Sequence, residues 1–348
     1  MSTMKAVFFK EHGDRSVLQY GELPVPKPGP GQVLVKVKFC ALNHLDIWVR
    51  KGWPGLNLQM PHVLGSDISG DIAEVGAGAE HLQPGQPVIV SPGHSCGHCY
   101  RCLLGQDNLC DQYGIVGEHF PGGYAQYVVV SAANIIPKPE SISYEEAAAF
   151  PLTFLTSWHM LVSEAQIQPG EWVLILAAGS GVGVAAVQIA RMFQARIIAA
   201  AGSDGKLKKA EELGAEYLIN YEKEDFYKRT REITGGRGVD VVFENVGETT
   251  WEKSIRILKK GGRLVTCGAT TGPRAVTDLR FVFYKHLKIL GNLMGSKGEV
   301  IHLTELVAQK KLRPVIDRIL DLKDAREAHA LMERREQFGK ILLRIPEE

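Results

Sequence analysis

The chain has 348 residues, of which 45% are apolar and 23% are charged, and its formal net charge is +1. This length predicts two domains, and the composition is that of an ordinary globular protein. A net charge this small excludes a general attraction to nucleic acid or to an anionic membrane surface. No apolar run reaches membrane-spanning length, and the N-terminal residues lack a signal-peptide pattern. We therefore expect a cytoplasmic protein with no nucleic-acid or membrane partner.

The first part of the chain, to about residue 135, is predicted to be rich in β-strands. Short apolar runs alternate with Gly- and Pro-rich turns, and they are predicted as strands at 6–9, 33–39, 72–75, 87–90 and 124–130. Strands spaced this densely predict a small, partly open barrel. The Pro-rich segment 23–31 is expected to be a loop. Ser143 is the predicted N-cap of a helix that runs through Pro151 towards Leu161.

From Glu171 the pattern changes to alternating strands and helices. Apolar runs predict six strands, at 173–178, 195–201, 216–220, 239–244, 263–267 and 287–293. Helices are predicted between them, at 182–193, 206–213, 223–233 and 249–259. This order predicts a doubly wound parallel sheet, the α/β fold class. The tail from about Lys297 is predicted to form two helices and a closing strand at 339–345, which we expect to return to the first domain.

A glycine-rich turn follows the first of these strands. It reads Ala178, Gly179, Ser180, Gly181, Val182, Gly183, and an amphipathic helix pattern follows. A strand, a glycine turn and a helix N-terminus together are typical of a site for the pyrophosphate of a dinucleotide. The simpler reading is a tight turn without a ligand, and the third glycine of the strict motif is replaced by Val184.

Four of the six cysteines lie within fifteen residues. Cys96, Cys99, Cys102 and Cys110 have the spacing C-x2-C-x2-C-x7-C. Four thiolates on one loop favour a closed tetrahedral zinc site with a structural role. An iron–sulfur cluster is the rival interpretation, but the proline that follows the last cysteine of a ferredoxin pattern is missing.

With both motifs present, the sequence resembles the medium-chain dehydrogenase/reductase superfamily, which includes zinc alcohol dehydrogenases and zinc-free quinone reductases. The resemblance runs from Met4 to Ile345 and includes the segments 65–76, 151–158 and 338–340. It implies a GroES-like catalytic domain at 1–150, completed by 297–348, and a nucleotide-binding Rossmann domain at 151–296. It also implies an active-site cleft between the two domains.

The family's catalytic zinc ligands are missing at the matching positions. Asn43 and Leu152 stand where the resemblance places cysteines, and Ser66 stands where it places a histidine. The chain therefore resembles the quinone reductase branch, although that branch usually lacks the four-cysteine loop. A second, unusual metal site remains open as an alternative, with the candidate donors His44, Asp46, His62, Asp67 and His119.

The second predicted strand of the parallel sheet ends at Ala201, where NAD enzymes carry an acidic residue for the ribose. Small residues at this position leave room for a 2′-phosphate, to which Ser203 and Lys206 can donate. The resemblance adds Tyr221 to this group and implies Gly268, Met294 and Lys340 as further cofactor-binding residues. We therefore expect NADP(H) rather than NAD(H), although Asp204 could repel the phosphate.

Without a Lewis-acid metal, an oxyanion must be stabilised by hydrogen-bond donors, which favours substrates that are already activated. We expect a reductase of quinones, enones or activated carbonyls, with a small-molecule substrate and with the catalytic candidates Asn43, His44, Asp46 and Thr156. Trp48, Trp53 and Phe120 could line an apolar substrate wall. An alcohol dehydrogenase and a dinucleotide-binding protein with little turnover remain alternatives. The resemblance also implies a homodimer, or a dimer of dimers, paired through the strand at 287–293.

Overall fold

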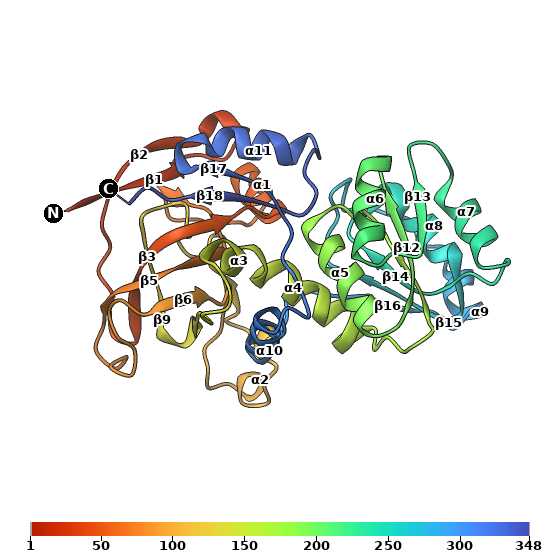
Figure 1. Ribbon diagram of the computed structural model, residues 1–348, viewed down its shortest axis with the longest axis horizontal. Coiled ribbons are helices and arrows are strands. Elements are labelled where there is room, and N and C mark those ends of the chain that lie inside the picture. The colour runs from red at the N-terminus through yellow and green to blue at the C-terminus, as the bar shows by residue number, and fades with distance from the viewer. Residues whose placement is uncertain (1, 348) are drawn as a thin grey trace. The chain divides into compact units, whose positions relative to one another are not determined.

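The computed structural model describes residues 2–347, which divide into two compact units (Figure 1). The first unit comprises Met1–Leu152 and Ser296–Glu348, and the second comprises Thr153–Gly295. The chain therefore leaves the first unit once and returns to it. No helix among residues 2–347 is both long enough and apolar enough to cross a membrane.

The first unit is built mainly from antiparallel strands. A three-stranded sheet has the order β2-β1-β4, and a seven-stranded sheet has the order β10-β6-β5-β3-β18-β17, with β9 also paired to β3. A third, two-stranded sheet joins β7 and β8. The strands of this unit are β1 (Thr3–Phe9), β2 (Gln19–Pro24), β3 (Gln32–Ala41), β4 (His62–Val63), β5 (Asp67–Val75), β6 (Pro87–Val90), β7 (Gly93–His94), β8 (Gly114–Ile115), β9 (Tyr127–Ser131), β10 (Ile135–Pro137), β17 (Ile316–Asp321) and β18 (Lys340–Arg344).

Helices of the first unit connect and cover these strands. They are α1 (His44–Lys51), α2 (Tyr100–Leu103), α3 (Tyr144–Ala149), α10 (Lys297–Ala308) and α11 (Ala325–Glu333), with short 3-10 turns at Arg15–Val17, Asp107–Leu109, Ala132–Asn134 and Leu322–Asp324. The apolar core of this unit combines side chains from β1, β3 and β5 with others from α11 and β18. The tail is therefore part of the first unit's core.

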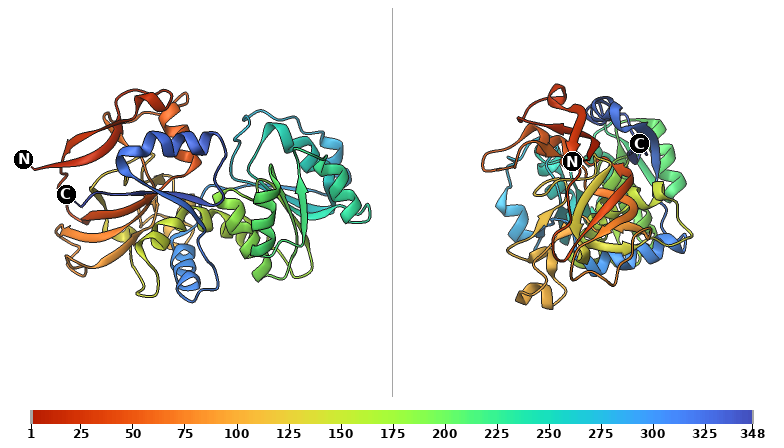
Figure 2. Two further views of the ribbon diagram at one scale, coloured as in Figure 1. Left: turned by 45° about the horizontal axis from the view of Figure 1, so that its top comes forward. Right: turned by 90° about the vertical axis from the view of Figure 1, so that its left-hand side faces the viewer.

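The last strand returns to the first unit, as we expected, and pairs with a strand near the beginning of the chain. Strand β18 pairs antiparallel with β3, and Leu342 lies opposite Ala41. Figure 2 shows this C-terminal strand among the N-terminal strands of the unit. Its residues Ile341, Leu342 and Leu343 are fully buried, so the strand is held by apolar packing as well as by its ladder.

The second unit contains the predicted doubly wound sheet, and the α/β fold class is confirmed. Its six strands are all parallel, in the order β13-β12-β11-β14-β15-β16. They are β11 (Trp172–Ile175), β12 (Arg196–Ala201), β13 (Tyr217–Asn220), β14 (Val239–Glu244), β15 (Leu258–Thr266) and β16 (Lys288–Gly291). The helices are α4 (Pro151–Trp158), which begins in the first unit, the π-helix His159–Glu164, α5 (Gly181–Met192), α6 (Asp204–Leu213), α7 (Phe226–Ile233), α8 (Glu248–Ile257) and α9 (Leu279–Tyr284).

Three predictions of secondary structure were wrong in detail. Strand β17 (Ile316–Asp321) was not predicted, because this edge strand is only half-buried and lacks a clear apolar alternation. The single helix expected from Ser143 is broken at Phe150, and α4 begins at Pro151, where a missing N–H costs nothing. The predicted loop at 23–31 starts two residues later than expected, since β2 extends to Pro24.

Candidate functional site

A buried polar cluster joins three parts of the first unit that are distant in sequence. Asn43 lies between β3 and α1, Asp67 is the first residue of β5, and Lys340 is the first residue of β18. The Lys340 ammonium donates to Asn43 Oδ1 over 2.6 Å and to Asp67 Oδ2 over 2.9 Å. The Asn43 amide in turn donates to the same Asp67 oxygen, over 2.9 Å. The three side chains therefore form a closed triangle of hydrogen bonds.

Burial makes this triangle energetically important. The side chains of Lys340 and Asp67 are only 4% and 0% exposed. A lysine and an aspartate are rarely buried to this extent without a charged partner. Because neither ion can reach bulk water, each depends on the other for compensation.

The second oxygen of Asp67 fixes the start of a helix. Asp67 Oδ1 accepts the backbone N–H of Leu152 over 2.7 Å. Leu152 lies in the first turn of α4, where the backbone N–H groups have no partner inside the helix. A carboxylate at this place is also favoured by the helix dipole. Asp67 therefore ties the entrance of α4 to the cluster.

Asp46 organises the backbone on the other side of Asn43. Its Oδ2 accepts the backbone N–H of Asn43 over 2.7 Å, and its Oδ1 accepts that of Gly65 over 3.0 Å. Tyr124 OH also donates to Asp46 Oδ2, over 3.3 Å. Burial raises the pKa of Asp46 to about 6, although these hydrogen bonds and the nearby Lys340 act in the opposite direction.

The other candidate donors for a second metal do not converge. His62 Nε2 lies 3.1 Å from the carbonyl oxygen of Gly117, and His119 Nδ1 accepts the backbone N–H of Ile115. Ser66 Oγ, which stands where the resemblance places a histidine ligand, is buried without a hydrogen-bond partner. Within residues 2–347, the four cysteines are the one group of His, Cys, Asp or Glu side chains arranged to hold a metal ion.

His44 is the first residue of α1 and is mostly buried. Its ring packs edge-on against the Trp48 ring, with the centroids 4.9 Å apart. Burial, together with the nearby charges of Arg335 and Lys51, lowers the pKa of His44 to about 4. His44 is therefore neutral at pH 7, and any hydrogen bond that its ring donates comes from an N–H group without a full positive charge.

The four predicted metal ligands do come together. Their sulfur atoms all lie within 4.8 Å of one another, with 3.5 Å between Cys99 and Cys102 and 3.9 Å between Cys96 and Cys102. A tetrahedral zinc site with Zn–S bonds of about 2.3 Å places its sulfurs about 3.8 Å apart, so the donor set fits this ion. Cys110 is buried and the other three are half-buried.

The cysteine lobe, residues 95–113, has almost no apolar core of its own. Strands β7 and β8 close its base. Four of its large apolar side chains are more than half exposed, namely Tyr100, Leu103, Leu104 and Leu109. A cross-link through the four sulfurs would therefore supply stability that apolar packing within the lobe does not.

The glycine turn of the second unit has the expected position between β11 and α5. Ser180 is the N-cap of α5, and its Oγ accepts the backbone N–H of Gly183 over 3.0 Å. A Cβ at Gly183 would lie 2.4 Å from the carbonyl oxygen of Ala177, so only glycine fits there. Gly183 therefore allows close packing of the helix on its own turn, and Val184 is accommodated without strain as a buried helix residue.

Apart from Lys340, which lies in the first unit, the other predicted cofactor residues follow strands of the same parallel sheet. Ser203 and Lys206 come after β12, Tyr221 after β13, Gly268 after β15 and Met294 after β16. Because the strands are parallel, these residues belong to the carboxyl edge, where α/β sheets bind their ligands. Thr156 also belongs to this unit, and its Oγ1 lies 3.9 Å from the sulfur of Met294.

The charge of Asp204 is compensated within the protein. Its two oxygens accept hydrogen bonds from Asn220 Nδ2 and from Lys223 Nζ, each over 2.6 Å. These contacts lower the pKa of Asp204, and the Lys223 interaction makes the largest contribution. Beside it, the Tyr221 ring packs over Gly202, where a Cβ would lie 3.2 Å from the ring.

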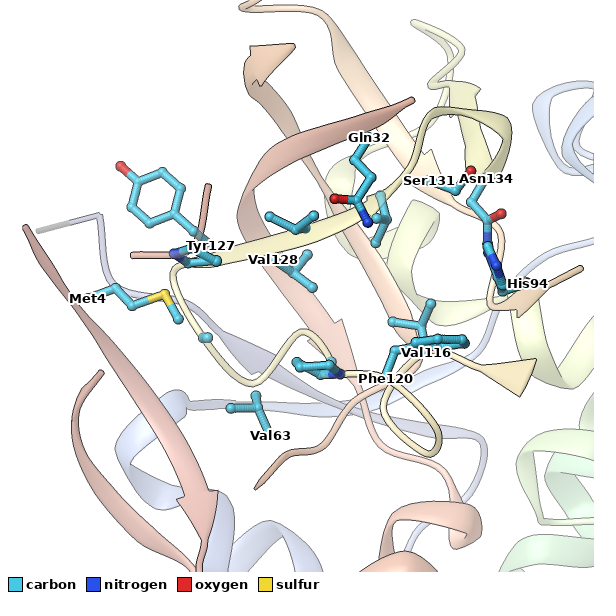
Figure 3. Close-up of a pocket in the computed structure, with 16 residues that line it drawn as sticks. Met4, Gln32, Val63, His94, Val116, Phe120, Tyr127, Val128, Ser131 and Asn134 are labelled. Atoms are coloured by element: carbon cyan, nitrogen blue, oxygen red, sulfur yellow. The ribbon is translucent and has the colours of Figure 1, made fainter. Parts of the chain in front are cut away.

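A separate, mainly apolar cavity of about 280 Å³ lies in the first unit (Figure 3). Phe120, Val63 and Val116 line it, with Met4 and Tyr127 at one end and His94 and Asn134 at the other (Figure 3). None of Asn43, Asp67 and Lys340 lines this cavity. The three aromatic residues expected to line one apolar wall do not line this cavity together, since Phe120 lines it and Trp48 and Trp53 do not.

Sequence reasoning missed several polar residues that the fold buries. The sequence indicates Asp67 only as a metal donor and Lys340 only as a cofactor ligand, yet the two form an ion pair. The sequence pattern does not single out Arg50, Tyr124 or His329, and all three are fully buried. The available signal was weak: a charged residue inside an apolar strand or helix pattern, such as Lys340 before Ile341, indicates that a buried partner is needed.

Comparison with known proteins identifies the family. The model of the "alcohol dehydrogenase GroES-like domain" matches residues 29–140, and that of the "zinc-binding dehydrogenase" matches residues 181–309. An NAD-dependent alcohol dehydrogenase of Saccharolobus solfataricus is 32% identical over 349 aligned residues, which cover 98% of this chain and 99% of that protein.

Two solved structures extend this finding. One is described as an NAD-dependent alcohol dehydrogenase, with a TM-score of 0.94, 48% identity and coverage of 99% of this chain and 100% of that chain. The other is a crotonyl-CoA carboxylase/reductase in complex with NADP, with a TM-score of 0.91, 26% identity and coverage of 98% and 94%. The chain belongs to the medium-chain dehydrogenase/reductase superfamily and is an oxidoreductase of that family.

The ion pair in the cluster leads to a prediction about stability. Lys340→Met leaves the Asp67 carboxylate buried without its cation, which should cost about 3–5 kcal/mol of unfolding free energy. The double variant Lys340→Met with Asp67→Asn removes both charges and should be less destabilised than Lys340→Met alone. Urea unfolding followed by circular dichroism measures both effects.

The matched control is Lys38→Met, because this lysine is solvent-accessible and pairs with the exposed Glu347 and, over 4.0 Å, with the partly exposed Asp71. An exposed pair contributes less than about 1 kcal/mol. If Lys340→Met costs no more than Lys38→Met, the ion pair does not stabilise the fold as described.

Proposed function

We propose that the protein is an NADP(H)-dependent reductase of quinones, enones or other activated carbonyl compounds that works without a catalytic metal. The observation that carries this proposal is the Asn43–Asp67–Lys340 triangle. The Lys340 ammonium occupies the oxygens of Asn43 and Asp67 that a cation would otherwise use. Ser66 offers only a hydroxyl where the family's zinc enzymes place a histidine.

The charge of the cluster favours activated substrates. The ammonium of Lys340 is balanced by the Asp67 carboxylate, so the cluster has no surplus positive charge comparable to that of a divalent metal ion. A bound nicotinamide supplies the hydride in this family of reactions. The chain itself contributes hydrogen-bond donors, for which Asn43, neutral His44 and Thr156 are our candidates. Donors of this kind suffice for an electrophile that conjugation has already activated.

A substrate panel tests this proposal. Purified enzyme should oxidise NADPH with quinones or enones at a far higher rate than it reduces NADP⁺ with simple primary and secondary alcohols. Chelation of loosely bound metal before the assay should leave the rate unchanged, because no step needs a metal ion at Asn43 or Asp67. Rapid oxidation of simple alcohols would contradict the proposal.

Alcohol dehydrogenase activity is the second candidate, and the relatives favour it. The 48% identical structure and the Saccharolobus relative are both described as NAD-dependent alcohol dehydrogenases. The same panel separates the two functions. Tight dinucleotide binding without turnover of any substrate in the panel would instead favour a binding role.

We propose NADP(H) as the preferred cofactor on the chemistry that follows β12. Ala201 stands where NAD enzymes carry a carboxylate that binds the ribose, so this position has no negative charge. The charge of Asp204 is compensated by its ion pair with Lys223. Ser203 and Lys206 follow β12 and Tyr221 follows β13, and their hydroxyl, ammonium and phenol groups are of the kinds that can donate to a 2′-phosphate. The relative solved with NADP supports this choice, and the relatives described as NAD-dependent oppose it.

Replacing the expected phosphate-binding lysine tests the cofactor preference. Lys206→Ala should raise the KM for NADPH roughly 10- to 100-fold, the value of one charge-assisted hydrogen bond, and should change the KM for NADH little. Lys208→Ala is the control, because Lys208 is exposed on the same helix and should affect neither cofactor. An equal effect of Lys206→Ala on both cofactors would remove the assignment.

We propose that Cys96, Cys99, Cys102 and Cys110 bind one structural zinc ion. The spacing of the sulfurs and the exposed apolar side chains of the lobe support this role. Metal analysis should find close to one zinc per chain and no iron. Cys110→Ser should lower the zinc content and the melting temperature together. Iron in place of zinc would contradict the proposal, and so would a zinc-free wild type that melts at the same temperature as the zinc-bound protein.

We also propose a homodimer, or a dimer of dimers, formed through the free edge of β16. Strand β16 ends the parallel sheet, and several apolar side chains near it are exposed, namely Val276, Leu279, Phe283, Tyr284, Ile289 and Leu293. Exposed apolar groups next to an unpaired strand favour association. Sedimentation velocity should find a dimer or tetramer, and Ile289→Lys should shift the association equilibrium towards the monomer. A monomeric wild type would contradict the proposed association.

A further inference from the structure

A fully buried arginine begins a chain of hydrogen bonds that ends at Asp46. Arg50, in the last turn of α1, has no exposed surface. Its guanidinium lies 3.0 Å from His329 Nδ1 and pairs with Glu333, which is on α11 with His329. His329 Nε2 lies 3.4 Å from Tyr124 OH, which lies 3.3 Å from Asp46 Oδ2.

Elementary hydrogen-bond chemistry fixes the direction of every link. A guanidinium has donors only, so His329 Nδ1 must accept from Arg50. A neutral imidazole that accepts at Nδ1 carries its proton on Nε2, and this N–H donates to the oxygen of Tyr124. The Tyr124 hydroxyl then has its own proton free to donate to Asp46. The chain therefore runs in one direction, from a permanent cation to a carboxylate.

Burial agrees with this assignment. The lack of water around His329, together with the adjacent Arg50 charge, lowers the pKa of the imidazole to about 3. Burial and the nearby Asp46 charge raise the pKa of Tyr124 well above its usual value. The histidine is thus neutral and the tyrosine protonated throughout the neutral range, as the direction of the chain requires.

The hydrogen-bond chain cannot carry protons to the protein surface. Arg50 stands between His329 and the partly exposed Glu333, and a guanidinium does not release its proton in a protein. At the other end, Asp46 is turned towards backbone N–H groups of Asn43 and Gly65. The function that remains for the chain is to hold Asp46 in place.

Asp46 sets the position of the polar cluster from two sides. Its two oxygens bind the backbone of Asn43 itself and of Gly65, two residues before Asp67. The space around Gly65 is also closed, because a Cβ there would lie 2.5 Å from the Tyr124 ring. Tyr124 therefore restricts the backbone at Gly65 in two ways, by contact with its ring and through its hydroxyl, which donates to Asp46.

We propose that Tyr124 and His329 are positioning residues, which lock Asp46 through a one-way hydrogen-bond chain from Arg50 and so hold Asn43 and Asp67 in register for the reaction. Only the consequence for catalysis rests on the proposed function; the tautomer and the backbone protection do not. The juxtaposition joins three separate elements, α1, α11 and the segment before β9, to the cluster.

Spectroscopy on the intact protein tests the direction of the chain without any substrate. In protein labelled with 15N-histidine, the His329 signals, identified by their loss in His329→Gln, should show the Nε2–H tautomer. They should not titrate between pH 5 and 8, and the tautomer should persist in Tyr124→Phe, because Arg50 still imposes it. The Nδ1–H tautomer, a mixture, or titration in this range would overturn the proposal.

Hydrogen exchange and kinetics test the positioning. Tyr124→Phe keeps the ring and removes the hydroxyl, so the amides of Asn43 and Gly65 should exchange faster in peptides covering residues 43–67. Tyr127→Phe, on the neighbouring strand β9, should leave this exchange unchanged. With a substrate that the wild type turns over, Tyr124→Phe should lower kcat roughly tenfold and leave the KM for the dinucleotide unchanged.

The two readouts separate this proposal from the proposed function. Unchanged exchange at both amides in Tyr124→Phe would overturn the positioning role, whatever the enzyme reduces. Faster exchange with a wild-type kcat would overturn the catalytic consequence. A wild type without reductase activity would contradict the proposed function and leave the tautomer and exchange results to decide the structural claim.

Discussion

The ion pair between Lys340 and Asp67 is the interaction on which the polar centre of the first unit depends. Two opposite charges that are almost completely buried hold β18, β5 and the β3–α1 junction together. The Asn43 side chain accepts a hydrogen bond from Lys340 and donates one to Asp67, and Asp67 also accepts a backbone N–H of the first turn of α4. A single ammonium thus cross-links segments that are nearly 300 residues apart. In our proposal, this cation provides the order that a metal ion provides in the zinc enzymes of the family, but it provides no comparable Lewis acidity.

Other buried carboxylates are held by hydrogen bonds from backbone N–H groups and hydroxyl groups. Asp46 accepts two backbone N–H groups and a tyrosine hydroxyl, and Glu244, fully buried at the end of β14, accepts the backbone N–H groups of Val246 and Gly247 and two hydroxyls. In both places the acceptor sets a backbone turn at the end of a strand or the start of a helix. Such turns are positioned by buried polar contacts, which are costly to leave unsatisfied, and not by apolar packing alone.

The sequence predicted the parts of the structure that follow from local patterns. The six parallel strands appear as apolar runs, the N-cap Ser143 as a serine before an acidic turn, and the four sulfurs as a spacing. The missed features depend on contacts between distant residues. Strand β17 has no pattern of its own, because it is a half-buried edge strand. The partner of Lys340 could not be predicted, since nothing near residue 340 indicates that Asp67 lies opposite. The same holds for Arg50 and His329, which are 279 residues apart.

In our proposal, a lysine and not a metal ion holds the residues of the polar cluster, and the four cysteines hold the one zinc ion of the chain. Anomalous X-ray diffraction from zinc-supplemented crystals, measured on both sides of the zinc absorption edge, locates every bound zinc directly. Our account predicts one strong peak per chain, between Cys96, Cys99, Cys102 and Cys110, and none within bonding distance of Asn43, Ser66 or Asp67. A second peak beside Asp67, with the Lys340 ammonium displaced, would contradict it.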